Sequence, residues 1–389
     1  MKKLIRILAA ALLIAGLFSV FAQAEGGDTA RLVCLNVGKA DCMLLLWQDE
    51  AYLIDTGYWQ TYPALKTALE QYGVTRLKGV FLTHCHKDHA GGLMDLAKSD
   101  IAVDAWYAAT IYYDVKEGEH PAELAAKERG ENVDWLSAGD VISCADGASF
   151  TVLGPLTVNT DNENNNSLVM RFASGAGSIL FTGDMKDDEE YELLDSFLPC
   201  DVLKVGHHGD NNATFSDMLS VVRPKVSLIL TSTQEEPDTP ASSTLKRLAA
   251  AGSKVYISQE MDDAMMVTLT DGDPAVENVR WNGVPEKIQG LTLSINLSDD
   301  TVTLANTGDQ SVSLKGCRLF STKGEEMLLM PEITLTAGQS FVIGTKTTKG
   351  AVDYQWNDKK VWHQSKRDMA ILYDAYGRAL ARTDNGFDE

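Results

Sequence analysis

Short apolar runs and longer amphipathic segments alternate along the chain from Arg31 to about Gly283. The short runs are rich in Val, Ile and Leu and are bounded by turn residues, which is typical of buried strands. We predict strands at Arg31–Val37, Met43–Trp47, Ala51–Ile54, Gly79–Leu82, Ser149–Leu153, Leu168–Phe172, Ser178–Phe181, Val202–Val205, Val226–Leu230, Lys254–Ile257 and Ala264–Leu269. Apolar residues at helical spacing predict helices over Pro63–Tyr72, Ala122–Arg129, Asp187–Phe197 and Ser242–Ala251. This alternation indicates a layered α/β domain, which we place at residues 29–283.

After the first domain the pattern loses its helical spacing. Leu291–Leu297 and Thr301–Asn306 alternate apolar and polar residues with a period of two, and Gly and Asp turns separate such segments. This pattern predicts a small all-β sandwich over residues 288–385, with Trp356 and Trp362 in its core.

The N-terminus has the three parts of a secretory signal. Three basic residues precede the apolar run Ile7–Phe21, and Ala22-Gln23-Ala24 has the small-residue pattern of a cleavage site. The apolar run is shorter than the ~20 residues that a membrane span needs. We therefore expect residues 1–24 to be a signal peptide and the mature protein to be secreted or extracytoplasmic, with no transmembrane domain after cleavage.

Composition and charge narrow the possible partners. The chain has 389 residues, 44% hydrophobic and 23% charged, as a soluble globular protein does. It carries 34 Lys and Arg against 55 Asp and Glu, a net charge of −21, and loss of a signal with three basic and no acidic residues makes this −24. Such an acidic chain is poorly suited to bind nucleic acid through a broad basic face.

Three of the seven histidines fall in one short segment directly after the predicted strand Gly79–Leu82. They are His84, His86 and His89, with Asp88 among them, and imidazole and carboxylate are ligands that divalent metals prefer. A solvated His-rich loop would give the same local pattern, but it would predict no partners elsewhere in the chain.

Two further predicted strands end in residues of the same kind. Ser178–Phe181 leads to Asp184, and Val202–Val205 leads to His207 and His208. Side chains at neighbouring strand ends of an α/β layer converge on one edge, so the three segments together predict a metal centre.

These motifs resemble the signature of the metallo-β-lactamase fold, and more narrowly the hydrolase domain of ComEC-type competence proteins and their secreted relatives. The resemblance covers about residues 31–270. It implies a four-layer αββα sandwich with metals at one edge, and a hydrolase, most readily of phosphodiesters. The segments that carry it are His84–His89, Phe181–Asp184, Leu35–Cys42, Leu53–Gly57, Asn165–Val169 and Val205–Gly209.

The resemblance also implies a ligand set for one or two ions of Zn²⁺ or Mn²⁺. His84 and His86 would bind the first metal, Asp88 and His89 would bind the second, and Asp184 would bridge them.

Residues outside the first cluster receive supporting roles from the same resemblance. His208 aligns with the later histidine ligand, because it directly precedes Gly, and its neighbour His207 would bind a substrate oxygen or replace it as ligand. Asp55 ends a predicted strand and would orient a ligand histidine, as Lys39 and Asp41 in an early loop also could.

One histidine of the broad family is missing. Only His120 lies in the corresponding interval, in the segment Lys116–Arg129, which we predict to be a helical lid. An Asn-Ser motif stands there instead, so Asn165 or Asn166 could donate to a phosphate oxygen. One metal position then has fewer ligands, which favours a single tight ion or a more labile pair. The candidate catalytic side chains are Asp88, His207 and Asn166.

Four segments of the second domain resemble the lamin-tail domain, an immunoglobulin-like sandwich: Thr301–Gly308, Val312–Leu319, Ile333–Val342 and Ala370–Gly377. His363 is isolated there and forms no catalytic pattern. The resemblance implies an accessory module, which either binds a cell-surface ligand or only stabilises the protein.

The leading hypothesis is an exported nuclease or phosphodiesterase, acting on a small or polymeric phosphodiester. A divalent cation lowers the pKa of bound water and so supplies a metal-bound hydroxide near neutral pH. One alternative is an amide or ester hydrolase of β-lactamase type, against which the missing histidine counts. The other is a non-catalytic surface-binding protein, against which the intact metal ligands count. The loops within Trp106–Trp135 would shape the pocket.

Overall fold

The chain forms two compact units, each with its own apolar core. The second unit consists of the chain from Trp281 onward together with Gln60–Ala64, and the first unit of the other described residues. The predicted signal peptide, residues 1–24, lies outside the described residues. No helix in the described part of the chain is long and apolar enough to cross a membrane. The computed structural model describes residues 28–113, 115–116, 118–356 and 360–387.

The first unit contains an eight-stranded sheet with the strand order β17-β16-β1-β2-β3-β5-β7-β8. Neighbours from β17 to β3 are antiparallel, and β3, β5, β7 and β8 are parallel. A separate parallel pair joins β4 (Arg76–Leu77) to β6 (Ala102–Val103). The strands of the large sheet are β1 (Ala30–Leu35), β2 (Cys42–Trp47), β3 (Glu50–Thr56), β5 (Gly79–Leu82), β7 (Trp106–Ala109), β8 (Val133–Leu136), β16 (Ala264–Leu269) and β17 (Ala275–Val279).

A seven-stranded sheet faces it, with the order β15-β14-β13-β12-β11-β10-β9. Strands β12 to β15 are parallel, and β9 to β12 are antiparallel. Every strand predicted for the first domain is present in one of the two large sheets. The strands here are β9 (Val141–Ser143), β10 (Ser149–Gly154), β11 (Val169–Ser174), β12 (Gly177–Phe181), β13 (Val202–Lys204), β14 (Val226–Ile229) and β15 (Lys254–Ile257).

The main core lies between the two sheets and is rich in aromatic rings. Phe81 and Phe172 come from different sheets, and each ring centroid lies within 5.2 Å of that of Phe150. Burial of each such ring contributes about 2 kcal/mol to stability. Both faces of the sheets are covered, which explains why every residue of β2 is buried.

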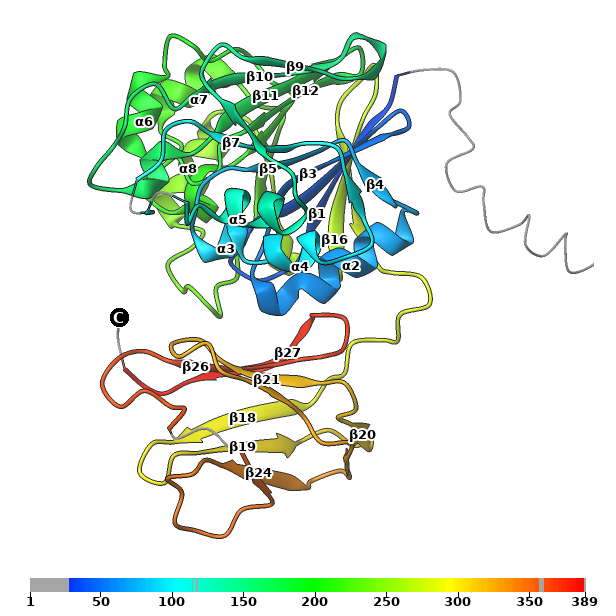
Figure 1. Cartoon of the computed structure of the whole chain (residues 1–389), viewed down its shortest axis with the longest axis vertical. Coiled ribbons are helices and arrows are strands. Elements are labelled where there is room, and N and C mark those ends of the chain that lie inside the picture. Colours follow the sequence, from blue (N-terminus) through cyan, green and yellow to red (C-terminus); the bar gives the residue numbers. More distant parts are fainter. Residues whose placement is uncertain (1–27, 114, 117, 357–359, 388–389) are drawn as a thin grey trace, which may run out of the picture. The chain divides into compact units, whose positions relative to one another are not determined.

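Helices complete the four layers (Figure 1). A second core joins β12, β13 and β14 to the helices on the outer face of the seven-stranded sheet, through residues such as Leu203, Met218 and Leu248. The predicted αββα sandwich is confirmed. The helices are α2 (Tyr62–Gln71), α3 (Lys87–Ala90), α4 (Leu93–Ala97), α5 (Pro121–Glu128), α6 (Asp187–Glu192), α7 (Ser216–Val222) and α8 (Ser242–Ala250).

The segment Trp106–Trp135 differs from the sequence prediction. Its ends form the parallel strands β7 and β8 at the edge of the eight-stranded sheet, and α5 is the crossover helix between them. Ala122, Ala125 and Ala126 of α5 are buried. The predicted helix is therefore present, but it is a packed layer of the sandwich and not a lid.

The second unit is a sandwich of two four-stranded sheets with a smaller pair, as predicted. The orders are β18-β19-β24-β25, β22-β21-β26-β27 and β20-β23. Trp356 and Trp362 pack edge to face in its core, with ring centroids 6.3 Å apart. The strands are β18 (Leu291–Asn296), β19 (Thr301–Asn306), β20 (Val312–Ser313), β21 (Arg318–Ser321), β22 (Met327–Leu329), β23 (Thr334–Leu335), β24 (Ser340–Gly344), β25 (Tyr354–Gln355), β26 (Met369–Tyr373) and β27 (Ala379–Asp384).

Candidate metal centre

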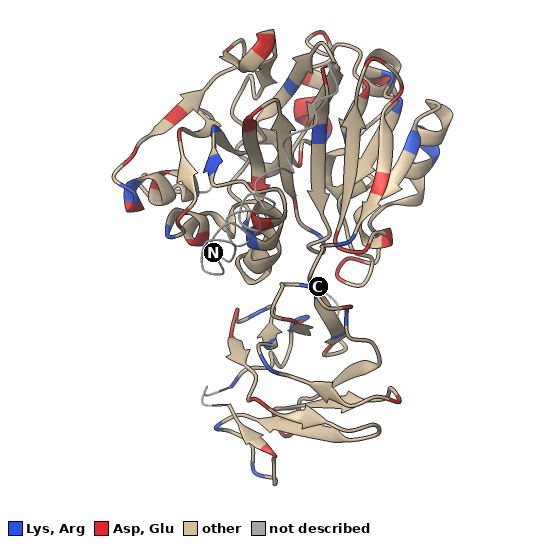
Figure 2. Ribbon diagram, turned by 90° about the vertical axis from the view of Figure 1, so that its right-hand side faces the viewer, with Lys and Arg blue, Asp and Glu red and all other residues tan. Residues whose placement is uncertain are grey.

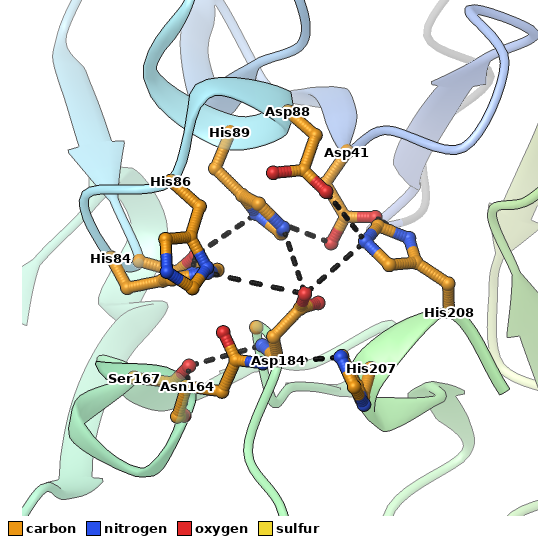
Figure 3. A network of polar contacts seen from close by, with 12 residues as sticks. Asp41, His84, His86, Asp88, His89, Asn164, Ser167, Asp184, His207 and His208 are labelled. Atoms are coloured by element: carbon orange, nitrogen blue, oxygen red, sulfur yellow. Dashed lines mark hydrogen bonds and ion pairs between the residues drawn. The ribbon is translucent and has the colours of Figure 1, made fainter. Parts of the chain in front are cut away.

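Side chains from both sheets meet where several parallel strands end (Figure 3). Asp55 lies at the end of β3, and His84 follows β5 in the eight-stranded sheet. Asp184 follows β12, and His208 follows β13 in the seven-stranded sheet. The sequence prediction that these segments converge is therefore met in the structure.

Four of the predicted ligands form one tight, buried group. Ligand atoms of Asp88, His89, Asp184 and His208 all lie within 4.8 Å of one another. The Asp184 Oδ2 atom is 3.3 Å from His89 Nε2 and 3.2 Å from His208 Nε2. The Asp88 Oδ2 atom is 3.3 Å from His208 Nε2. We call these four residues the ligand group.

His84 and His86 lie beside the ligand group rather than within it. His84 Nε2 is 3.9 Å from Asp184 Oδ2 and 3.0 Å from His86 Nδ1. The side chain of His84 is buried, whereas His86 is exposed. A second ion would thus find two imidazoles and a shared carboxylate, a poorer set than that of the first.

The ligand group fits a divalent cation. His89 Nε2, His208 Nε2 and Asp184 Oδ1 are buried and have no hydrogen-bond partner. Leaving such atoms unpaired costs about 1–3 kcal/mol each. A cation bound among imidazole and carboxylate ligands would satisfy them together.

The atoms behind the two ligand histidines fix their orientation. His89 Nδ1 donates to Asp55 Oδ2 at 2.8 Å, and the same carboxylate accepts from the Thr83 backbone N–H and hydroxyl. His208 Nδ1 donates to the Leu230 carbonyl at 2.8 Å. Each Nε2 atom is therefore left facing the centre, which is how hydrogen bonds behind a ligand prepare it for a metal.

Burial and neighbouring charge shift the pKa values in the centre. Burial and the adjacent His89 lower the pKa of His84 well below its usual value, so this imidazole is neutral. Burial opposes ionisation of Asp184, but His208 and His89 outweigh it and hold the pKa of Asp184 well below its usual range. The Asp184 carboxylate in turn raises the pKa of His89 and of His208 against the effect of burial.

The backbone turns sharply to place the late histidines. His207 and His208 have φ angles of 45° and 53°, the left-handed region that residues with a Cβ atom avoid. Gly183, before Asp184, has a φ of 50°, and a Cβ atom there would lie 2.9 Å from the Thr83 Cβ atom. Only glycine allows the strand end to come this close to the loop that carries His84.

His207 lies at the edge of the centre with both ring nitrogens engaged. Its Nδ1 atom is 2.8 Å from Asn212 Oδ1, and its Nε2 atom is 3.1 Å from Asn164 Nδ2. The ring is partly exposed, whereas the His208 side chain is fully buried. In the described residues His208 is thus the member of the pair that joins the ligand group.

The asparagine run takes a different arrangement from the one expected. It forms a 3-10 turn, so successive side chains point in different directions. Asn166 is buried, and its amide bonds to Asn159 and to the Glu163 carboxylate, away from the ligand group. Asn165 accepts from the backbone N–H of Lys186. The amide beside the centre is that of Asn164, which contacts His207 Nε2. The contacts of Asn166 do not fit the donor role expected for it.

Two lysines enter the centre, and only one was singled out from the sequence. Lys39 Nζ is 3.8 Å from Asp88 Oδ2 at the more open side. Lys204 was missed, although a lysine inside the apolar run Val202–Val205 is itself a signal of a buried partner. Its Nζ atom is 2.6 Å from Asp41 Oδ2, and both side chains are fully buried.

His120 lies apart from the centre, as its sequence context indicated. It is the N-cap residue of α5, and its Nδ1 atom accepts from the Ala122 N–H at 3.3 Å. Its ring packs against Tyr112 and Trp135. This histidine belongs to a local aromatic cluster and not to the ligand set.

Curated relatives share part of the chain. It is 28% identical to ComE operon protein 3 of Bacillus subtilis over 215 residues, a stretch that covers 50% of this chain and 27% of that protein. It is 26% identical over 278 residues to competence protein ComA of Neisseria gonorrhoeae, which covers 70% of this chain and 37% of that protein. The chain thus spans well under half the length of these relatives.

Solved structures resemble parts of this chain at low identity and with low TM-scores. Igni18, a metallo hydrolase of Ignicoccus hospitalis, has a TM-score of 0.41 at 16% identity, over 65% of this chain and 100% of that one. A diphosphatase from the PhnP family has a TM-score of 0.39 at 14% identity, over 62% of this chain and 98% of that one.

Family models match both units. The Lamin Tail Domain model matches residues 249–386, a range that begins before the all-β unit does. The Metallo-beta-lactamase superfamily model matches residues 35–233, which contain the whole ligand group and the strands that carry it. This chain therefore belongs to the metallo-beta-lactamase superfamily of hydrolases and carries a lamin tail domain.

Proposed function

We propose that this protein is an exported hydrolase of phosphodiester bonds that works with one or two ions of Zn²⁺ or Mn²⁺. The observation that carries the proposal is the ligand group, in which two oriented imidazoles and two carboxylates converge at one buried point. A cation held there supplies an activated water near neutral pH and stabilises negative charge on the reacting oxygens.

The chain's own residues prepare and serve this chemistry. Asp55 and the Leu230 carbonyl hold the ligand imidazoles in place, which avoids reorganisation during the reaction. The side chain of Asp88 is 12% exposed, against 2% for Asp184, so Asp88 is the carboxylate of the ligand group that water and substrate reach more easily. We propose that Asp88, besides its place in the ligand group, orients the attacking water.

A charge at the open side favours an anionic substrate. The side chain of Lys39 is 22% exposed, and its ammonium stands 3.8 Å from Asp88 Oδ2. A phosphodiester carries one negative charge, which this ammonium would attract and orient, whereas a neutral ester or amide would gain nothing from it. Figure 2 shows acidic and basic positions interspersed along the ribbon. The single local charge of Lys39 favours a small or flexible substrate over a nucleic acid bound across a broad face.

A substrate panel with metal analysis tests the proposal. Protein purified without a His-tag should contain Zn²⁺ or Mn²⁺ and hydrolyse bis-p-nitrophenyl phosphate or single-stranded DNA. The His208→Ala variant should lose both the metal and the activity, and His120→Asn serves as a control outside the centre. Turnover of a chromogenic β-lactam alone would favour the amide hydrolase. Silence on every substrate with the metal bound would favour a surface-binding protein.

Export is tested separately from catalysis. If the signal is cleaved after Ala24, the mature chain should begin at Glu25 and be found outside the cytoplasm. N-terminal sequencing of protein from fractionated cells measures both. An intact Met1 in the mature protein would contradict export by this route.

We also propose that the lamin tail domain binds a cell-surface ligand, which a pull-down with intact cells and each purified unit would test.

A further inference from the structure

Lys204 places a positive charge inside the metal centre. The residue ends β13, and its side chain is fully buried. Its Nζ atom is 2.6 Å from Asp41 Oδ2, donates to the Gly183 carbonyl at 2.9 Å and lies 3.7 Å from Asp184 Oδ1. A buried ammonium is costly unless it is paired in this way, so the site must gain something from it.

Its main partner, Asp41, stands behind both ligand histidines. The carboxylate oxygens of Asp41 are 3.8 Å from His89 Nδ1 and 3.4 Å from His208 Nδ1. Apart from the contact with the Lys204 ammonium, neither oxygen makes a hydrogen bond, although both are buried. Figure 3 shows the Asp41 carboxylate between the rings of His89 and His208, with a dashed line to His89. Its negative charge is therefore balanced by the ammonium rather than by hydrogen bonds.

Asp41 also belongs to a second group that could hold a metal. Ligand atoms of Asp41, Asp55 and His89 all lie within 4.8 Å of one another, and all three residues are buried. By donor type and spacing this group could bind a divalent cation as the ligand group does. The Lys204 ammonium stands at hydrogen-bonding distance from one of its carboxylates.

We propose that the Lys204 ammonium acts as a resident cation that closes the Asp41–Asp55–His89 group to metals. It neutralises Asp41 and thereby directs divalent ions to the ligand group. Four buried carboxylates, those of Asp41, Asp55, Asp88 and Asp184, crowd this region. Without the ammonium, the unpaired Asp41 charge would favour a further ion in its place, because an isolated buried charge is strongly unfavourable.

The direct test counts ions in the Lys204→Met variant. Methionine keeps the length of the side chain and removes its charge. We expect Lys204→Met to bind one Mn²⁺ more per chain than the natural protein at the same free Mn²⁺ concentration, by native mass spectrometry. The matched control is Lys225→Met. Lys225 directly precedes β14, its side chain is half-exposed, and it pairs with Asp201 at 3.1 Å. An unchanged ion count in Lys204→Met would overturn the proposal.

A second measurement removes the partner and leaves the ammonium in place. In Asp41→Asn the ammonium keeps the Gly183 carbonyl and, as its ion-pair partner, the ligand Asp184, so it should compete with the divalent ion. We expect Mn²⁺ affinity, measured by competition with a chelator, to fall about tenfold or more in Asp41→Asn. The double variant Asp41→Asn/Lys204→Met loses both charges together and should return to within about threefold of the natural affinity.

This pair of variants decides the matter even if Lys204→Met fails to fold. Equal affinities in Asp41→Asn, the double variant and the natural protein would overturn the proposal. So would a double variant that binds more weakly than Asp41→Asn, because Lys204 would then position the ligands instead of excluding a metal. Ion counts do not depend on which bond is cleaved, so this test can fail while the substrate panel succeeds, and the reverse.

Discussion

Three residues of the metal centre hold the left-handed backbone conformation. Asp55, His207 and His208 have φ angles of 58°, 45° and 53°. Such a conformation costs a residue with a Cβ atom about 1–2 kcal/mol. Asp55 fixes the Thr83 loop through two hydrogen bonds, and His208 Nδ1 donates to the Leu230 carbonyl. The local strain is therefore offset by contacts that orient ligands.

The role of Asp55 can be tested with little change in shape. Asparagine tolerates a positive φ, so Asp55→Asn keeps the backbone but weakens the acceptor for His89 Nδ1–H. We expect cation affinity to fall about 10- to 100-fold, the usual effect of losing a partner behind a ligand. Chelator competition measures it. The control is Asp201→Asn, which alters a partly exposed carboxylate outside the centre, and equal affinities in both variants would rule out an orienting role.

His86 and His208 should differ in their effect on metal content. His208 belongs to the ligand group, whereas His86 is exposed and contacts it only through His84. We expect His208→Ala to lose its tightly bound ion after gel filtration, and His86→Ala to keep it while losing any weaker second ion. Elemental analysis per chain distinguishes the two. The same loss in both variants would mean that the ions bind as an inseparable pair.

The sequence predicts the ligands better than the residues that support them. His84, Asp184 and His208 stand two or three residues after predicted apolar strands, so type and position coincide. Lys204 stands inside an apolar run, which signals a buried partner, but that partner, Asp41, is distant in sequence and only the fold brings the two together. The run of asparagines was recognised, but which amide faces the centre depends on the direction of each residue in a 3-10 turn.

At the scale of elements, composition decides which strands the sequence predicts. The apolar strands of both sheets are recognised from their runs of Val, Ile and Leu. Strands β7 and β8 were missed because their sequences, WYAA and VDWL, contain no such run. The predicted helix Asp187–Phe197 ends earlier, at Glu192, although Leu193 and Phe197 remain buried. Their apolar spacing therefore reflects burial in a turn as well as in a helix.

The start of α5 should make stability depend on pH. Burial lowers the pKa of His120 from 6.5 to about 4, so folding favours the neutral ring. The unfolded chain then binds the proton more readily, and the stabilisation present above pH 6.5 is lost as the pH falls towards 4. Between pH 7.5 and pH 5 the loss should be about 2 kcal/mol for this group.

The variant His120→Asn isolates that contribution. Asparagine is a good N-cap residue and does not titrate, so the cap is kept and the proton-linked term is removed. Urea unfolding at pH 7.5, 6 and 5 should show the natural protein losing stability with acidification more steeply than the variant. Parallel curves for the two proteins would show that His120 has an ordinary pKa.

At the scale of the whole molecule, two separate cores explain why composition alone predicts so little. The α/β unit buries its apolar residues on both faces of two sheets, and the β-sandwich has a core of its own. The change from mixed to strictly alternating patterns marks the boundary between them. Net charge and overall hydrophobicity average over both units and therefore exclude classes of protein without identifying either fold.

Separate cores predict two unfolding transitions, and only one should respond to metal. The ligand group lies entirely in the α/β unit, so a cation stabilises that unit by its binding free energy. At 100 times the dissociation constant this amounts to about 2.7 kcal/mol, which raises the melting temperature of a unit this size by roughly 5–11 °C. The β-sandwich should melt at the same temperature with Mn²⁺ and with chelator in differential scanning calorimetry. In the His208→Ala variant, Mn²⁺ should leave the melting temperature of the α/β unit unchanged as well. A single transition that moves as a whole would mean that the two units unfold as one cooperative structure.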